Sequence, residues 1–174
     1  MGIETESGGL EAYPARIVVL SASVAILLYA VGATIVGYLW VWLAAAYLLF
    51  CAWVELNVLR KSCVHCYYYG KICGLGKGKL CSWLFRRGDP RRFVEREASW
   101  RELIPDMLVL VIPLVAGIVA LILDFSWLLL GLLVLLLLLA LGGNALVRGS
   151  FACKYCRQRE LGCPAEKLFG GRDG

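Results

Sequence analysis

Three long stretches of this chain contain no charged residue. They cover residues 17–54, 107–123 and 125–147 and are 38, 17 and 23 residues long. Because a helix rises about 1.5 Å per residue, about 20 residues cross the ~30 Å hydrocarbon core of a bilayer. The first stretch is long enough for two crossings and each of the others for one. The pattern therefore predicts four transmembrane helices, at 16–36, 39–59, 104–123 and 127–146.

The composition agrees with a membrane protein. Of the 174 residues, 60% are hydrophobic and the mean hydropathy is +0.74, which excludes an ordinary soluble domain. The first 16 residues are acidic, and no short apolar core with a small-residue cleavage site follows them. We therefore expect no cleaved signal peptide. The net charge of +5 is a signal of membrane topology, and we expect no specific nucleic-acid partner.

Basic residues predict the orientation of the helices. Eleven of the 18 Lys and Arg lie within 60–101, six lie from Arg148 onward, and the short connections near 37–39 and 124–126 carry none. The positive-inside rule then places both termini and the central loop in the cytoplasm of a multi-pass cell-membrane protein. The expected order is an N-terminal cytoplasmic segment (1–15), a hairpin (16–60), a cysteine-rich basic loop (61–101), a second hairpin (102–148) and a cysteine-rich tail (149–174).

The cysteines repeat along the chain. Cys63, Cys66 and Cys73 are spaced C-x2-C-x6-C, and three further cysteines from Cys153 onward have the same spacing. Each triplet follows an apolar hairpin, with a proline expected just before its first helix, at Pro14 and Pro105. Because one unit crosses the bilayer twice, both copies would enter it in the same orientation. The sequence predicts an all-α integral membrane four-helix bundle made of two parallel tandem repeats.

Thiols in such short turns more often bind metal than form disulfides in a reducing compartment. A C-x2-C turn directs two sulfurs onto one ion, and zinc takes four such ligands in a tetrahedron. Zinc is the expected cofactor, with an iron–sulfur cluster as the alternative. Copper, disulfides and free thiols stay open. The candidate ligands are Cys63, Cys66, Cys73, Cys81, Cys153, Cys156 and Cys163.

Three arrangements of these ligands stay open. Each half could hold its own ion, with Cys81 completing the first set of four. The six repeated cysteines could instead form one shared cluster, and a third arrangement puts a [4Fe–4S] cluster on four thiolates. The doubled spacing, with CKYCRQRELGC as its second copy, resembles the binuclear zinc cluster of fungal transcription factors. That resemblance implies six cysteines around two ions, with Cys63 and Cys153 as bridges and Cys81 spare, and it implies no DNA binding.

A second resemblance covers the cytoplasmic third of the chain. The string CVHCYYYGKICGLGKGKLCSWLFRRGDPRRF, followed later by CKYCRQRELGCPAEKLF, resembles uncharacterised small multi-pass membrane proteins of archaea and related prokaryotes. The motif CxxCYYYGKxC carries this resemblance. It implies the cysteine pattern and no activity.

Weaker signals lie near the membrane ends of the helices. Glu55 falls inside the second predicted helix, and an intramembrane carboxylate is a candidate functional group, with Arg60 or Arg148 as its expected partner. A structural ion pair at the interface is the simpler explanation. Cys51 is expected to pack as a small apolar residue. Pro113, inside the third predicted helix, is expected to bend it.

The central loop holds further candidates. His65, inside the first C-x2-C turn, is expected to face solvent and not to bind the ion. The glycines at 74, 76 and 78 lack the spacing of a phosphate loop and predict turns whose amides reach thiolate sulfurs. The tyrosines at 67–69 are expected to anchor in lipid headgroups. The segment 90–103 suits either a short interfacial helix or a solvated linker.

The leading hypothesis is a metal-binding membrane scaffold whose cytoplasmic cysteine cluster has a structural or docking role. Its partners would be the bilayer, a cytoplasmic protein and a further copy of the chain. The alternative is an iron–sulfur or dithiol protein that transfers electrons in the membrane, and the third hypothesis is a transporter of soft metals. With one histidine and no nucleophile–base pair, the sequence gives no sign of an enzyme.

Overall fold

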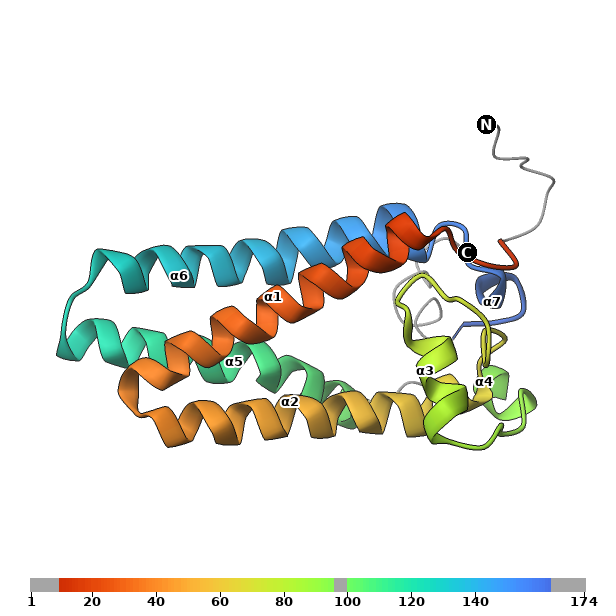
Figure 1. Ribbon diagram of the computed structural model, residues 1–174, viewed down its shortest axis with the longest axis horizontal. Helices are drawn as coiled ribbons and strands as arrows, with labels where there is room; N and C mark the ends of the chain where they lie inside the picture. The colour runs from red at the N-terminus through yellow and green to blue at the C-terminus, as the bar shows by residue number, and fades with distance from the viewer. Residues whose placement is uncertain (1–9, 96–99, 164–174) are drawn as a thin grey trace. The chain divides into compact units, whose positions relative to one another are not determined.

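A computed structural model describes residues 10–95 and 100–163 of the chain (Figure 1). These residues are all-helical, and the only β pairing within them is an isolated parallel bridge between Leu10 and Cys156. The long helices come in two consecutive pairs, each followed by shorter elements. In chain order the elements are α1 (Ala15–Leu39), α2 (Val41–Lys61), η1 (Cys63–His65), α3 (Lys77–Leu84), α4 (Arg91–Glu95), α5 (Trp100–Leu123), α6 (Trp127–Leu137), η2 (Leu138–Gly143), η3 (Leu146–Ala152) and α7 (Arg157–Glu160).

Three of the predicted crossings are confirmed as helices long and apolar enough to span a membrane. They are α1, α2 with the turn that follows it, and α5. The fourth apolar helix, Trp127–Gly143, is shorter. It begins as α6 and changes to π-helical hydrogen bonding in η2 and again in η3. Its role as a fourth crossing therefore stays a prediction.

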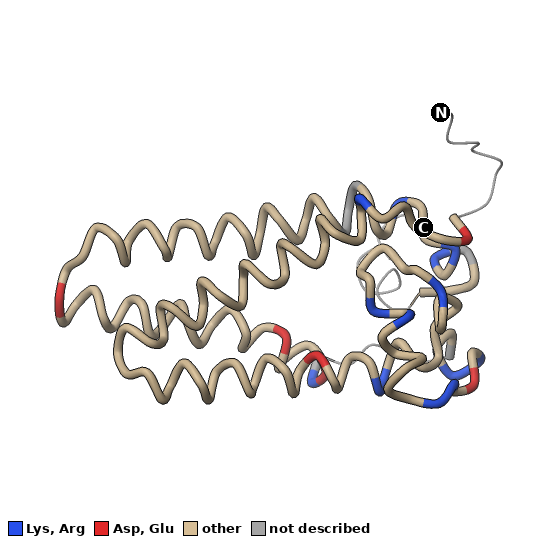
Figure 2. The backbone as a smooth tube through the Cα atoms, in the orientation of Figure 1, with Lys and Arg blue, Asp and Glu red and all other residues tan. Residues whose placement is uncertain are grey.

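The chain divides into two compact units. The first, which we call the thiol unit, combines Met1–Ser21, Leu59–Ala98 and Val147–Gly174. The second, which we call the helical unit, combines Ala22–Val58 and Ser99–Leu146. Only Arg101 of the 18 Lys and Arg residues belongs to the helical unit, so nearly all the blue positions along the backbone in Figure 2 belong to segments of the thiol unit.

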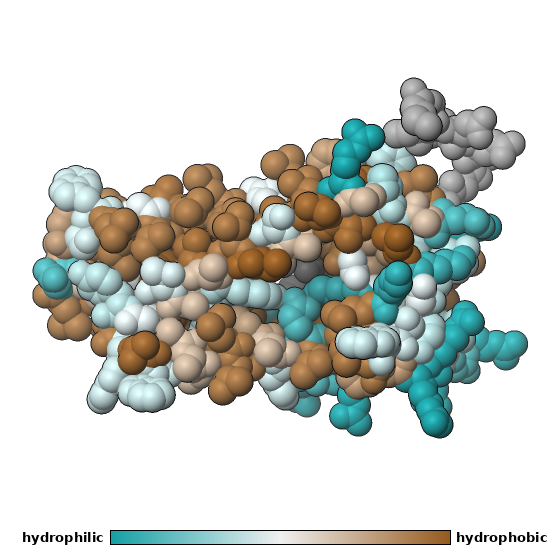
Figure 3. All heavy atoms as spheres, viewed as in Figure 1, coloured by the Kyte–Doolittle hydropathy of each residue, from teal (hydrophilic) through white to brown (hydrophobic). Residues whose placement is uncertain are grey.

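The helical unit is held together by apolar packing. One buried cluster joins α1, α5 and α6 through residues such as Ile35, Ala120 and Leu136. A second cluster joins α1, α2 and α5 and includes Tyr47, whose hydroxyl donates to the backbone oxygen of Val109 at 2.8 Å. The outward faces are also apolar, and the side chains that cover these helices are mostly hydrophobic (Figure 3). Such an outer surface suits contact with lipid.

The prolines are placed differently from the prediction in one case. Pro14 directly precedes α1, and the buried Pro113 lies inside α5, both as expected. Pro105 was expected before the third long helix, but it lies inside α5 because the helix begins at Trp100. The missing N–H of Pro105 leaves only the carbonyl of Arg101 without its usual partner, which a helix tolerates near its start.

The segment between the two hairpins is only partly helical. α4 covers Arg91–Glu95 and α5 starts at Trp100, and residues 96–99 between them lie outside what the structure describes. Whether 90–103 forms one interfacial helix therefore stays a prediction. The side chain of Trp100 and the tail 164–174 also lie outside what the structure describes.

Candidate thiol site

All seven candidate ligands belong to the thiol unit, although they come from two segments far apart in the sequence. All eight cysteines are within the described ranges and all are free thiols. The eighth, Cys51, belongs to the helical unit, where it is buried and packs with Val54 and Tyr47 as predicted. Folding therefore brings the two triplets into one compact unit and leaves Cys51 apart from them.

The two C-x2-C turns have the same local geometry. The N–H of Cys66 donates to the carbonyl of Cys63 at 3.3 Å, and the N–H of Cys156 donates to that of Cys153 at 3.3 Å. A short helical element adjoins each turn, η1 in the first and α7 in the second. The two C-x2-C motifs therefore share the same backbone hydrogen bond across the turn.

The glycine-rich loop supports the third cysteine of the first triplet. The N–H of Gly78 donates to Sγ of Cys73 at 3.2 Å, which confirms the prediction that these turns direct amides toward sulfur. A side chain at Gly78 would overlap the carbonyl oxygens of Tyr68 and Lys71. Gly76, at φ +73°, lets the chain turn into α3 in a conformation that other residues rarely adopt. The loop therefore positions a donor at the Cys73 sulfur.

Cys81 has a different environment from the other thiols. It is fully buried on α3, packs with Leu59 and Val64, and donates its S–H to the carbonyl of Leu59 at 3.6 Å. Burial raises the pKa of Cys81, and the nearby Cys73 adds to the rise. Cys63 packs against the edge of the same cluster. Cys81 thus anchors α3 to the end of α2.

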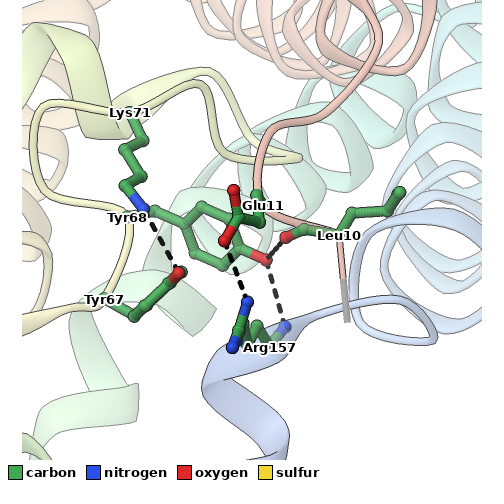
Figure 4. A network of polar contacts seen from close by, with 6 residues as sticks. All are labelled: Leu10, Glu11, Tyr67, Tyr68, Lys71 and Arg157. Carbon is green, nitrogen blue, oxygen red and sulfur yellow. Dashed lines mark hydrogen bonds and ion pairs between the residues drawn. The ribbon is translucent and has the colours of Figure 1, made fainter. Parts of the chain in front are cut away.

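Backbone and side-chain bonds connect the two cysteine segments directly. The N–H of Tyr67 donates to Oε1 of Gln158 at 2.7 Å, and Gln158 is itself buried. The hydroxyl of Tyr68 accepts from the N–H of Arg157 at 3.0 Å and donates to the carbonyl of Leu10 at 2.5 Å (Figure 4). One phenol therefore joins three segments of the thiol unit.

The expectation that the tyrosines anchor in lipid headgroups is wrong for Tyr68, which is buried. Tyr68 is only 2% exposed and packs beside Tyr13 in a tilted arrangement, with ring centroids 5.6 Å apart. Tyr69 donates to the carbonyl of Phe85 at 2.6 Å. Their aromatic bodies fill the small core of the thiol unit while their hydroxyls satisfy loop carbonyls. Tyr67 is half-buried, and the ammonium of Lys71 is 4.4 Å from its ring centroid.

The N-terminal segment is a third part of the site that sequence reasoning missed. The N–H of Leu10 donates to Tyr155 at 2.9 Å, and the N–H of Tyr13 donates to Ile72 at 3.0 Å. Glu11 pairs with Arg157 at 3.1 Å across the protein surface (Figure 4). This segment therefore contacts both cysteine segments. An acidic, irregular stretch carries no periodic signal that could have predicted this pairing.

The thiols are close enough for their charges to interact. Burial raises the pKa of Cys66 to about 11, and charge on Cys156, Cys73 and Cys163 adds to the rise. Burial also raises the pKa of Cys156, with Cys153 and Cys163 adding to it. Several thiolates so placed repel one another, so a bound cation would stabilise the charged forms.

The sulfurs nevertheless do not converge on one point. Within residues 10–95 and 100–163, no group of three His, Cys, Asp or Glu side chains has the geometry to hold a metal ion. The donor set itself is soft and rich in sulfur, as zinc and iron–sulfur clusters require. The half-buried ring of His65 places Nδ1 2.9 Å from the carbonyl of Asp89, so this contact ties the imidazole to its own loop.

A separate polar pair lies in the helical unit. The hydroxyl of Tyr29 on α1 donates to a carboxylate oxygen of Glu55 on α2 at 2.5 Å. The prediction named Arg60 or Arg148 as the partner of Glu55 and missed Tyr29. The side chain of Arg148 lies outside what the structure describes. Asn57 donates to the carbonyl of Trp53 one turn earlier in its own helix. We interpret both contacts as supports between and within helices.

Comparison with known proteins adds no relative. No family model, curated protein or solved structure matches the chain.

Proposed function

We propose that this chain is a metal-binding membrane scaffold, with four spans built from two parallel repeats and a thiol unit that binds zinc. One observation supports the proposal most strongly. The segments that carry Cys66 and Cys156 are hydrogen-bonded to each other through Tyr67–Gln158 and Tyr68–Arg157, although about ninety residues separate them in sequence. The matching turns at the two C-x2-C motifs support the repeat. The excess of Lys and Arg in the central loop and the tail supports a cytoplasmic position for the thiol unit.

The role of the metal follows from the construction of the thiol unit. This unit is assembled from three short segments and has little regular structure. Its described core contains one small buried cluster around Leu59, Val64 and Cys81. A structural metal can contribute about 10 kcal/mol or more to the folding of such a small unit. The ion would therefore hold the central loop and the tail together and create a surface for a cytoplasmic partner.

The environment of Cys81 favours the shared arrangement of six thiols. Its S–H donates to the Leu59 carbonyl within an apolar cluster. Cys81 therefore already serves as a buried packing residue. The six repeated cysteines would then hold the metal, and Cys81 would be dispensable for binding. If instead each half held its own ion, Cys81 would be the fourth ligand of the first.

Metal analysis of anaerobically purified protein in nanodiscs tests the proposal. We expect a colourless protein with bound zinc, and loss of zinc in Cys66→Ser and in Cys156→Ser. Cys51→Ala is the matched control, because it removes a thiol of the helical unit and should keep full zinc content. Cys81→Ala separates the arrangements, since only the shared cluster keeps its metal.

Two results would contradict the zinc scaffold. A brown protein that absorbs near 400 nm and bleaches on reduction would establish the iron–sulfur alternative. Equal metal content in the wild type, Cys66→Ser and Cys156→Ser would exclude the thiol unit as the binding site.

A further inference from the structure

Helix α3 has two apolar faces, and the structure accounts for only one. Gly78 and Cys81 are buried against the thiol unit. On the other face Trp83 is 87% exposed, and Leu80 and Leu84 are each 48% exposed. Residues spaced by three and four lie side by side on a helix, so these three side chains form one continuous patch. We call this patch the Trp83 stripe, made of Leu80, Trp83 and Leu84.

The surroundings of the Trp83 stripe are basic. Lys79 on the same helix is exposed, and so are Arg86 and Arg87 directly after it. No Asp or Glu occurs between Glu55 and Asp89. An apolar stripe beside several cations, with no nearby acid, is the composition of a helix that lies in the headgroup region of an anionic bilayer.

We propose that the Trp83 stripe inserts into the surface of an anionic lipid leaflet. The indole of tryptophan favours the membrane–water interface, where its apolar body and its polar N–H are both satisfied. Lys79, Arg86 and Arg87 would contact phosphate groups of the lipids. Helix α2 is long and apolar enough to cross a membrane, and it ends at Lys61. Because α3 begins only 16 residues later, the Trp83 stripe lies close to a bilayer along the chain.

This inference is independent of the proposed metal. Cys81 and Gly78 face inward on α3, while the stripe faces outward, so substitutions in the stripe leave the candidate ligands in place. Zinc content of the stripe variants should therefore equal that of the wild type. A change in lipid contact without a change in zinc content would separate the two ideas experimentally.

Tryptophan quenching by brominated lipids tests the proposal on the full chain. The protein is placed in nanodiscs, one copy per disc, with brominated phosphatidylglycerol or brominated phosphatidylcholine. The emission of Trp83 is obtained as the difference between the wild type and Trp83→Phe. Trp53→Phe is the positive control, because Trp53 is 54% exposed on α2 within a candidate span. We expect quenching of Trp83 in phosphatidylglycerol discs.

Charge variants test the selection for anionic lipid. The triple variant Lys79→Gln, Arg86→Gln, Arg87→Gln should weaken binding of the Trp83 stripe to the lipid surface roughly 100-fold. Each of the three cations should contribute a similar factor of about five to this binding. Quenching of Trp83 should then fall to the level seen in phosphatidylcholine. An unquenched Trp83 in phosphatidylglycerol discs would overturn the inference. Equal quenching in the two lipids would overturn the anionic selectivity, and quenching that needs two copies per disc would assign the stripe to a dimer.

Discussion

The hydroxyl of Tyr68 accepts a hydrogen bond from the backbone N–H of Arg157, 89 residues later in the chain. The same hydroxyl donates to the carbonyl of Leu10. The central loop, the tail and the N-terminal segment therefore meet at one buried oxygen. Tyr68 is two residues after Cys66, and Arg157 directly follows Cys156. This contact explains how thiols from separate segments come to lie in one unit.

Removing that oxygen should loosen the thiol unit. Tyr68→Phe leaves the N–H of Arg157 and the carbonyl of Leu10 without this partner, and an unsatisfied buried group costs about 1–3 kcal/mol. We expect faster proteolysis of both the central loop and the tail in nanodiscs. Tyr67→Phe is the matched control, because its hydroxyl contacts only the exposed Lys71 in the described contacts and should change little. Cleavage confined to the tail would contradict the shared assembly.

Gly78 should tolerate no side chain. In Gly78→Ala the new methyl group would meet the carbonyls of Tyr68 and Lys71, and backbone atoms cannot move aside as a flexible side chain can. We expect a loss of several kcal/mol in the thiol unit, of the order found for severe packing conflicts (~4 kcal/mol). Reduced zinc content and faster proteolysis would measure it. Gly131→Ala is the control, since nothing lies within 4 Å of an added methyl there.

Alkaline pH should destabilise the metal-free thiol unit. Burial raises the pKa of Cys66 to about 11, whereas the thiol of an unfolded chain titrates near ~8.5. Between these values the unfolded state loses its proton first, so stability is full below ~8.5 and falls as the pH rises toward 11. Denaturant midpoints of chelator-treated protein should therefore decrease over this range. Cys66→Ala should make the fall less steep without abolishing it, because burial also raises the pKa of Cys63 to about 12. A midpoint that rises with pH would contradict the burial of these thiols.

The Tyr29–Glu55 contact should stabilise the helical unit. Tyr29→Phe removes a hydrogen bond to a carboxylate between α1 and α2, which typically contributes about 1.5–3 kcal/mol. We expect a lower resistance to unfolding by SDS, followed by circular dichroism. Tyr38→Phe is the control, because that side chain is 47% exposed at the end of α1. Equal effects of the two substitutions would show that the Glu55 contact adds no stability.

The long helices were the most predictable part of the fold. Uncharged stretches of the right length predicted α1, α2 and α5 within a few residues, because hydrocarbon excludes charge and requires backbone groups to bond within the segment. The start of α5 was wrong by four residues, since Pro105 was taken as a boundary that the helix in fact continues past. The fourth apolar helix was predicted as a full crossing and is shorter. It also contains π-helical turns, which cannot be predicted from a pattern of apolar residues.

The candidate site was predictable in its chemistry but not in its construction. The spacing of the cysteines identified the thiols, and the glycines at 74–78 correctly predicted an amide donor at Cys73. The buried Tyr68 was misread because an aromatic–basic cluster next to a membrane helix has the same composition whether it faces lipid or fills a core. Burial depends on contacts with Leu10 and Arg157, which no local pattern contains.

By itself the sequence determined that this is a helical membrane chain with two matching sets of thiols, because hydropathy and residue spacing are local properties. Only the tertiary structure decided that the two sets share one compact unit, that Tyr68 joins them and that Cys81 turns inward while Trp83 turns outward. Those outcomes depend on long-range packing and hydrogen bonding, where each buried donor and acceptor must find a partner from a distant part of the chain.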